Sequence, residues 1–503
     1  NYCFSPIVGT YSLILFLYFI FIFELNSKFF LSITSYILVF LAIISFKEII
    51  KIYKLIIEQL IKNKESSFYL LFIIYILHFF IATSPITHAD AIDYHFSGSL
   101  NLLNFGHFHK EILPMNNTLV SLGELIMSLG LSVKAEQFSS LIQFLSLIAL
   151  IPFFNNKIKN RFFLIFILIC PITFFLISSY KPQLLFSVSS LLIFIFLVNH
   201  FSKTNLDELK KIFPIVLIIL CINSLAKYSF HLSSLLLVIY FFYLMKKRNL
   251  LGYSIFVGIL IFSFLYLPYL MFRHQYFDTS LIDLIKSPLP TNLYGYQSHH
   301  DLISGGKLDI LNMIFPKSIL AITSTYGPLI ILCFLMINKK VLEYKIPISL
   351  IIIFIVSVFI FGGNLPRFLF EGFLWLVFII SIIFNKNSYS YKIFSKVIYL
   401  QLIFMIPIYL FFIIKIFPGS INDDYKKKVM LENANGYELA SWANKKLDKS
   451  DILLSSHRSI SLFKNKTYSD IFTWHIDLSK AEANIYLNFL KSKKINIILF
   501  YIN

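Results

Sequence analysis

The sequence predicts an all-α polytopic membrane protein with a small α/β module at its C-terminal end. Composition is the first observation: 57% of the 503 residues are hydrophobic and 14% are charged, and the mean hydropathy is +0.76. Such values are typical of chains that lie largely in lipid, and they exclude the soluble globular classes. The second observation is that apolar segments of roughly 17 to 23 residues recur as far as residue 417. The third is that residues 418–503 alternate between helical and strand-like patterns instead.

About thirteen segments are long and apolar enough to cross a bilayer. Their approximate bounds are 7–24, 29–46, 67–86, 137–154, 162–179, 184–200, 212–226, 230–245, 250–271, 318–337, 346–362, 367–384 and 394–417. Basic links such as KEIIKIYK, MKKRN and NKNSYSYK follow every second span, and by the positive-inside rule these links face the cytoplasm. The predicted transmembrane domain, 1–417, then carries two large outer loops, 87–135 and 273–317. Residues 418–503 form an extracytoplasmic module.

Charge and cysteine usage narrow the possible partners. The net charge of +18 belongs mainly to the cytoplasmic ends of the spans, and no arginine-rich arm indicates binding to nucleic acid. Membrane lipids are therefore the expected surroundings. The four cysteines lie in or beside apolar runs without paired spacing, which argues against a disulfide framework and against a cysteine-based metal site.

A twice-acidic segment, THADAIDYH at 87–95, directly follows the third span. Asp90 and Asp93 should therefore emerge at the outer membrane surface, where a carboxylate can meet a lipid headgroup and accept a proton from a hydroxyl group. The alternative is structural, because an Asp before a helical pattern often caps the helix N-terminus. From there to residue 135 the apolar residues recur at helical spacing among polar ones, which predicts short amphipathic helices in the interface.

Four further ionisable residues fall at predicted outer ends of spans: Lys181, Lys227, His231 and Arg367. Ionisable groups near a membrane helix are costly, so they often mark a functional site. An anionic lipid phosphate suits such a cluster, and the Arg367 guanidinium can bind it through two parallel hydrogen bonds. The alternative is that these long side chains only reach toward the headgroups from helix ends.

The second outer loop is rich in Tyr, His and turn residues. Tyr294 and Tyr296 can stack on a sugar, and His299, His300 and Asp301 are candidate cation ligands. Contiguous side chains rarely converge on one ion, so neither a metal site nor a cofactor is predicted. In the C-terminal module, NGYELASWANKKL predicts a helix, DILLSS a strand, HRSISLF a short helix, and AEANIYLNFLKSKKINIILF a helix followed by a strand.

Asp90, Tyr94, His95, Gly106 and LIMSLGLS (125–132) occur in an order that resembles the glycosyltransferase C superfamily, membrane enzymes that take sugars from polyprenyl-phosphate carriers. SSYKPQLLF (178–186), INSLAKYSFHL (222–232) and GGNLPRFLFEGFLWLV (362–377) extend the resemblance over roughly 67–417. The family often has a second acid directly after the first. Here that place holds Ala91 and the next acid is Asp93, so the choice between the two Asp residues stays open.

The resemblance implies a glycosyltransferase, with inversion at the sugar, that moves a sugar from a polyprenyl phosphate to a lipid, glycan or protein acceptor. It places the reaction on the extracytoplasmic face of a bacterial inner membrane. Asp90 or Asp93 would be catalytic, and the substrate-binding residues would be Tyr94, His95, Lys181, Lys227, His231, Tyr294, Tyr296 and Arg367. Two alternatives are an enzyme like an O-antigen ligase or polymerase, and a lipid or solute transporter without catalysis.

Overall fold

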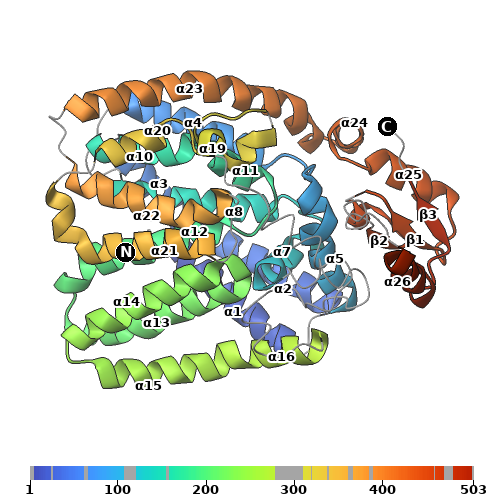
Figure 1. Cartoon of the computed structure of the whole chain (residues 1–503), viewed down its shortest axis with the longest axis horizontal. Coiled ribbons are helices and arrows are strands. Elements are labelled where there is room, and N and C mark those ends of the chain that lie inside the picture. The colour runs from blue at the N-terminus through green and yellow to red at the C-terminus, as the bar shows by residue number, and fades with distance from the viewer. Residues whose placement is uncertain are drawn as a thin grey trace.

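The structure is a computed structural model. It describes residues 5–23, 27–61, 66–106, 121–154, 158–277, 310–318, 320–336, 339–360, 366–384, 389–457, 459–469 and 480–500. Two parts are apparent in Figure 1: a large bundle of long, roughly parallel helices, and a small part with three strands at one end of the bundle.

The first half of the bundle begins with long apolar helices and then changes to shorter ones. In chain order (η marks π- and 3₁₀-helical turns) its elements are α1 (Ser5–Ile22), α2 (Lys28–Ile44), α3 (Phe46–Ile61), α4 (Ser66–Ala82), η1 (Ala91–His95), α5 (Phe96–Phe105), α7 (Leu122–Ser132), α8 (Phe138–Ile148), α9 (Ile151–Phe154), α10 (Ile158–Ile169), α11 (Pro171–Ser178) and α12 (Leu184–Ile195).

The second half contains the longest helices. Its elements are η2 (Phe196–His200), η3 (Phe201–Lys203), α13 (Leu206–Ala226), η4 (Tyr228–Phe230), α14 (His231–Lys247), α15 (Leu251–Ile261), η5 (Phe262–Tyr266), α16 (Leu267–Phe277), α19 (Ile310–Ile314), η6 (Leu320–Ser324), α20 (Leu329–Leu335), η7 (Lys339–Tyr344), α21 (Lys345–Ile360), η8 (Pro366–Leu369), α22 (Phe370–Ile383), α23 (Tyr389–Ile416) and η9 (Phe417–Ser420).

The protein is a helical membrane protein, but the expected count of about thirteen spans is not supported. Seven helices in the described part of the chain are long and apolar enough to cross a bilayer. These are Ser5–Ile22, Leu184–Lys203, Leu206–Ala226, Leu251–Gln275, Lys340–Ile360, Pro366–Ile383 and Tyr389–Ser420.

An eighth span is present if the bent pair Arg161–Ile169 and Pro171–Ser178 crosses as one. Its two halves meet at 59° because Cys170 is extended and Pro171 begins the second helix, where the proline ring prevents a continuous hydrogen-bond ladder.

The remaining predicted spans are shorter or broken helices. Three of them, 29–46, 67–86 and 230–245, are represented by α2, α4 and α14, with 17 residues each. The span predicted at 318–337 is divided between η6 and α20. Apolar runs alone do not show where a helix ends or breaks, so thirteen apolar runs do not establish thirteen spans.

The interior of the bundle is formed by α12, α22 and α7, which are buried along almost their whole length. α12 packs against α22 and α8, and α7 against α1, α2, α5 and α13. The expectation that residues up to 135 form amphipathic helices in the interface is therefore wrong for α7: its residues 122–131 are all buried because neighbouring helices surround it.

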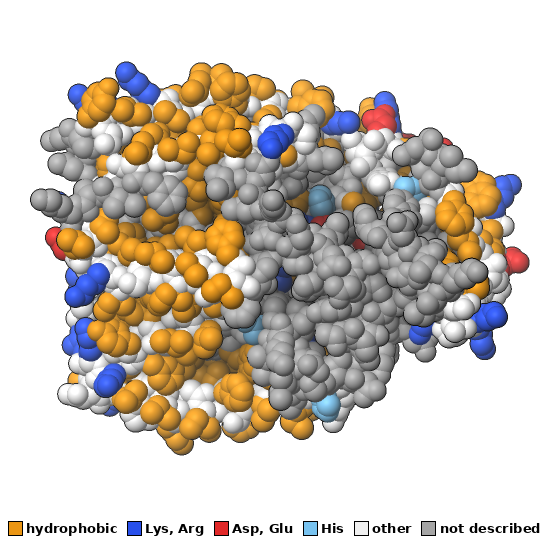
Figure 2. Space-filling model, in the orientation of Figure 1, with side chains coloured by type: hydrophobic (Ala, Val, Ile, Leu, Met, Phe, Trp, Pro, Cys, Tyr) orange, Lys and Arg blue, Asp and Glu red, His pale blue; other side chains and the backbone are white. Residues whose placement is uncertain are grey.

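Figure 2 shows a broad band of apolar side chains over the long helices, and Lys and Arg side chains lie along the edge of the band farthest from the strands. Three consecutive basic residues, Lys246, Lys247 and Arg248, end α14. The apolar band is the part of the surface suited to contact lipid.

The C-terminal part contains α24 (Asp423–Asn433), α25 (Tyr437–Lys446), β1 (Ile452–Ser455), η10 (Ile460–Leu462), β2 (Lys466–Ser469), α26 (Lys480–Ser492) and β3 (Ile497–Leu499). Its sheet is parallel with the order β2-β1-β3, and Leu453 lies opposite Thr467 on one side and Ile497 on the other. The predicted helices and strands of this part are confirmed, whereas β2 had not been expected because KTYS is short and polar.

We expect the two ends of the bundle to lie on opposite sides of the membrane. Lys247 and Lys449 are both exposed, the first in the basic link after α14 and the second in the C-terminal part. A membrane-impermeant thiol reagent should label Lys247→Cys and Lys449→Cys from opposite sides of sealed vesicles, with the protein lacking either substitution as the control. Labelling of both from one side would contradict this topology.

Candidate functional site

The acidic segment follows α4 and enters a π-helical turn. In η1 the Phe96 N–H donates to the Ala91 carbonyl oxygen, five residues back, and such turns often occur at functional sites. Asp90 occupies the position before η1, but its side chain makes no capping hydrogen bond there. Asp90 therefore does not cap this helix with its side chain.

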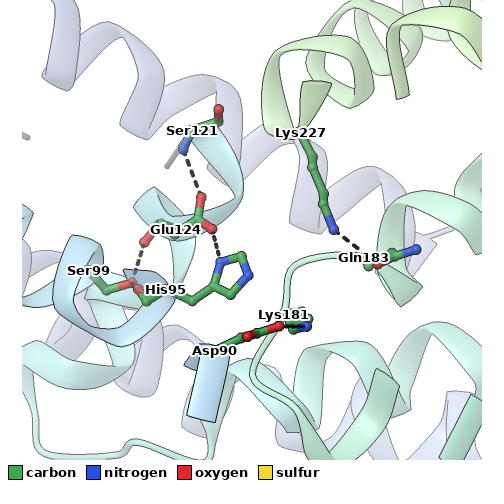
Figure 3. Close-up of polar contacts among 8 residues, drawn as sticks. All are labelled: Asp90, His95, Ser99, Ser121, Glu124, Lys181, Gln183 and Lys227. Atoms are coloured by element: carbon green, nitrogen blue, oxygen red, sulfur yellow. Dashed lines mark hydrogen bonds and ion pairs between the residues drawn. The ribbon is translucent and has the colours of Figure 1, made fainter. Parts of the chain in front are cut away.

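Asp90 is instead the ion-pair partner of a buried lysine. The Lys181 ammonium donates to Asp90 Oδ2 (Figure 3), and Arg367 Nη1 lies 4.0 Å from the same oxygen. The side chain of Lys181 is 1% exposed, that of Asp90 13% and that of Arg367 22%. Lys181 precedes α12 and Arg367 lies in η8 before α22, so the ion pair joins three segments that are distant in sequence.

Lys227 joins the same cluster through an amide. Its ammonium donates to Gln183 Oε1 at 3.0 Å, and Gln183 Nε2 donates to the Arg367 carbonyl oxygen at 3.0 Å. Gln183 thus connects the start of α12, the end of α13 and η8. Because the partner of Lys227 is a neutral amide, no carboxylate among the described residues forms an ion pair with this ammonium.

Burial and mutual repulsion disfavour the charged forms of both lysines. Burial and the nearby Arg367 guanidinium lower the pKa of Lys181 to about 7, although Asp90 acts in the opposite direction. The same two causes lower the pKa of Lys227 to about 8, with Glu124, Asp90 and Glu371 opposing them. Both groups lie in links outside the spans. A second anion beside them would restore their charge.

A His–Glu pair lies beside the cations. His95 Nδ1 is 2.5 Å from Glu124 Oε1, and the Ser121 backbone N–H donates to Glu124 Oε2 at 2.8 Å (Figure 3). The Ser99 hydroxyl donates to the carbonyl oxygens of His95 and Glu124, at 3.0 and 3.2 Å. Both ionisable side chains are buried, and burial raises the pKa of Glu124 to about 8 while it lowers the pKa of His95 well below its usual value.

A glycine allows the two groups of residues to approach each other. A Cβ atom on Gly123 would lie 2.5 Å from Pro182 Cβ and 3.2 Å from the Ala226 carbonyl oxygen. Pro182 stands between Lys181 and Gln183, and Ala226 precedes Lys227. The absence of a side chain at Gly123 therefore lets the first turn of α7, with Glu124, lie directly against the links that carry both lysines.

The other predicted site residues lie around this cluster or outside the described part. Asp93 is buried in η1, and the ring of Tyr94 lies 4.2 Å from that of His95. His231 begins α14 and its ring contacts that of Tyr266, with 5.9 Å between centroids. Tyr294 and Tyr296 and the candidate cation ligands His299, His300 and Asp301 lie outside the described residues.

The strand-containing part of the chain touches the site segment. The Ser461 hydroxyl of η10 donates to the Ile92 carbonyl oxygen inside η1, and η10 also packs against α5. At the other end of the segment, the Ser420 hydroxyl donates to the Thr83 carbonyl oxygen at 2.5 Å. Residues 83–95 are thus contacted at their start by Ser420, the last residue of the final span, and inside η1 by Ser461 of the strand-containing part.

Comparison with protein families gives two matches along the chain. The DUF1420 N-terminal domain matches residues 46–430, and the DUF1420 C-terminal domain matches residues 432–503. The chain belongs to the DUF1420 family. No curated protein and no solved structure matches it.

All described members of the site, from Asp90 to Arg367, fall in the DUF1420 N-terminal domain, and Ser461 is a contribution of the DUF1420 C-terminal domain. The two family domains meet within α24, at residue 431. The sequence predicts the boundary between the transmembrane domain and the C-terminal module at residues 417 and 418, where the last apolar run ends.

Sequence reasoning missed two residues that organise the site. Glu124 sits three residues after Ser121, a spacing that reads as a helix-capping box, and the structure does contain that box. What the pattern does not reveal is that the same carboxylate also holds His95. Gln183 carried no signal beyond its position two residues after Lys181, because a glutamine at a helix start is common.

We predict that Gly123→Ala destabilises the protein by about 1 to 3 kcal/mol, because the added methyl group overlaps Pro182 in a packed interior. Gly252→Ala is the matched control, since a Cβ there meets nothing within 4 Å and alanine favours a helix. Thermal unfolding in detergent measures both. Equal stability of the two variants would show that the close approach at Gly123 is not required.

Proposed function

We propose that the protein is a glycosyltransferase of the C type that uses a polyprenyl-phosphate-linked sugar and modifies a lipid, glycan or protein acceptor on the extracytoplasmic face of the cell membrane. The observation that carries the proposal is the convergence of three cations from three separate segments: Lys181 and Arg367 lie at the Asp90 carboxylate, and Lys227 is joined to them through Gln183. The resemblance over residues 67–417 agrees with it.

The charge balance of the cluster favours an anionic ligand. Asp90 accepts a hydrogen bond from Lys181 but lies 4.0 Å from Arg367, beyond hydrogen-bond distance, and Lys227 donates to an amide. Two cations therefore lack a hydrogen-bonded anion among the described residues. The phosphodiester of a polyprenyl-phosphate-linked sugar adds a negative charge and acceptor oxygens to this cluster, and charge-assisted hydrogen bonds are strong in a site shielded from water.

The position of the cluster suits a lipid-linked phosphate. It lies where the spans containing α12, α13 and α22 begin or end, so a ligand can hold its phosphate there while its polyprenyl chain stays in the apolar layer. The side chains of Arg367 and Asp90 are 22% and 13% exposed, whereas that of Lys181 is 1% exposed. The phosphate would thus approach from the side of Arg367 and Asp90.

In this function the cations stabilise the leaving group. Breaking the bond between the anomeric carbon and the phosphate oxygen increases the negative charge on that oxygen, and preorganised cations favour this change. Asp90 keeps the cations in place before the donor arrives. Once a phosphate pairs with Lys181, that ammonium no longer depends on Asp90 for its negative partner.

Sugar transfer from synthetic polyprenyl-phosphoryl glucose, mannose and galactose to native membrane acceptors tests the proposal directly. Arg367→Lys should reduce transfer about tenfold or more, a loss of about 1.4 kcal/mol, because lysine keeps the charge but not the planar fork. Arg248→Lys is the matched control, since Arg248 lies at the basic end of α14 and donates to the Ser202 carbonyl oxygen. Equal transfer by wild type and Arg367→Lys would exclude a phosphate contact through the guanidinium fork.

We also expect the binding of polyprenyl phosphate to depend on pH. The pKa of Lys181 is lowered to about 7 and that of Lys227 to about 8 in the free protein, so both lose charge as the pH rises through this range. A bound phosphate favours the charged lysines, so binding takes up protons and the affinity falls between about pH 7 and about pH 9. Calorimetry in buffers of different ionisation enthalpy measures the uptake.

Two controls accompany this experiment. Polyprenol has the same chain without the phosphate, and its binding should not change with pH. Lys181→Arg keeps a charge at every pH tested, so part of the pH dependence should disappear. Binding of polyprenyl phosphate that neither takes up protons nor exceeds that of polyprenol would place the phosphate away from these lysines.

A further inference from the structure

The Nε2 nitrogen of the buried His95 imidazole is not used by the contacts described above. Nδ1 is engaged by Glu124, whereas Nε2 is buried and has no hydrogen-bond partner among the described residues. His95 is 2% exposed, and an unsatisfied ring nitrogen at such a position is costly. The unpaired Nε2 nitrogen is therefore a candidate contact for a ligand atom.

The free edge of the ring faces the cluster of cations. In Figure 3 the imidazole lies between Glu124 on one side and Lys227, Gln183 and Lys181 on the other. The charges that act on His95 also come from that side, with Lys227 and Lys181 among them. A group bound at Nε2 would thus lie beside a phosphate held by the two lysines.

The orientation of the ring is fixed by several contacts. Glu124 uses one carboxylate oxygen for His95 Nδ1 and the other for the Ser121 N–H, so it cannot swing away without losing a helix cap. Ser99 ties the backbone carbonyls of His95 and Glu124 together. A carboxylate that positions an imidazole whose second nitrogen faces a substrate site is an arrangement suited to general base catalysis.

We propose that His95 is the catalytic base that takes the proton from the acceptor hydroxyl, and that Glu124 is the residue that positions it. This inference rests on the proposed sugar transfer and assigns the acceptor side of that reaction. It changes the role expected for Asp90, whose carboxylate already accepts a hydrogen bond from one cation and faces a second. Cations around a carboxylate make it a poorer proton acceptor, and the same lysines lower the pKa of His95, so geometry decides between them: Asp90 Oδ2 is engaged by Lys181, whereas His95 Nε2 has no hydrogen-bond partner among the described residues.

The step balances without any further reactant. The acceptor oxygen forms a bond to the anomeric carbon of the sugar as its O–H proton passes to His95 Nε2. The bond between the anomeric carbon and the phosphate oxygen breaks, and its electron pair stays on the phosphate, beside Lys181, Lys227 and Arg367. The imidazolium is stabilised by Glu124 through Nδ1–H and then releases its proton to water, which leaves a glycoside and a polyprenyl phosphate.

The protonation of the pair predicts how the reaction depends on pH. His95 is an acceptor at Nε2 only when Glu124 is ionised and takes the Nδ1–H, and the pKa of Glu124 is raised to about 8 by burial. The other charges that act on His95 are Lys227, Lys181, Asp90 and His88, and η10, which packs against η1, contributes Ile460, Ser461 and Leu462, none of which titrates. With saturating donor, whose bound phosphate keeps both lysines charged, transfer should therefore increase as the pH rises through about 8.

Three variants test the proposal on sugar transfer and on polyprenyl phosphate binding. His95→Gln should lose about a hundredfold or more of transfer, as expected for a missing general base, but still bind polyprenyl phosphate. Glu124→Gln should lose less transfer than His95→Gln. Its transfer should begin to increase at lower pH than in the wild type, because the imidazole then titrates without a carboxylate beside it. His200→Gln, at the exposed far end of the span that begins with α12, is the control and should behave like wild type.

The outcomes separate this inference from the proposed function. Normal transfer by His95→Gln, or an unmoved pH profile in Glu124→Gln, would overturn the assignment of the base while leaving the phosphate site intact. Loss of the pH-dependent increase in Asp90→Asn would return the role of base to Asp90. Failure of the wild type to bind polyprenyl phosphate would instead reject the proposed function itself.

A second measurement does not depend on the identity of the sugar. Diethyl pyrocarbonate acylates an unprotonated imidazole nitrogen, and mass spectrometry of the peptides identifies the site. Modification of His95 should become faster as the pH rises through about 8 and should be slowed by polyprenyl phosphate but not by polyprenol. A His95 that is never modified, or is equally reactive with and without polyprenyl phosphate, would contradict an open Nε2 beside the phosphate.

Discussion

The ion pair between Asp90 and Lys181 is the interaction on which the arrangement of the site depends. A lysine that is 1% exposed in a membrane protein must be paired with an anion or lose its charge, and Asp90 is the carboxylate that reaches it. Removing one member of such a pair leaves an uncompensated buried charge, which costs several kcal/mol. The pair therefore holds the segment after α4 against the link before α12. It also draws in Arg367, whose carbonyl oxygen is held by Gln183.

Two groups of residues with different chemistry meet at this ion pair. The links before α12, after α13 and before α22 contribute cations, whereas η1 and α7 contribute the His95–Glu124 pair. Gly123 allows the two groups to touch. The C-terminal part contacts the site through η10, whose Ser461 donates to the Ile92 carbonyl oxygen, and Ser420 at the end of the last span donates to that of Thr83. A displacement of the C-terminal part would therefore shift η1, the turn that carries His95.

The sequence predicted the membrane class, most helices and four members of the cluster. Asp90, Lys181, Lys227 and Arg367 were found because ionisable residues at the ends of apolar runs are costly and conspicuous. Glu124 was not predicted, because its contact with His95 depends on the packing of α7 against α5, which the local spacing of residues does not show. The count of thirteen spans is not supported because the ends and breaks of helices, such as the bend at Cys170 and Pro171, depend on backbone conformation that an apolar run does not show. Tyr294 and Tyr296 stay predictions.

The most direct measurement is an electron cryo-microscopy structure of the protein in lipid nanodiscs with bound polyprenyl phosphate. We expect phosphate density within hydrogen-bond distance of Lys181, Lys227 and Arg367. The Asp90 carboxylate should have moved away from the Lys181 ammonium, and His95 Nε2 should face the same space as the phosphate. Phosphate density elsewhere, with the Asp90–Lys181 ion pair unchanged, would contradict it.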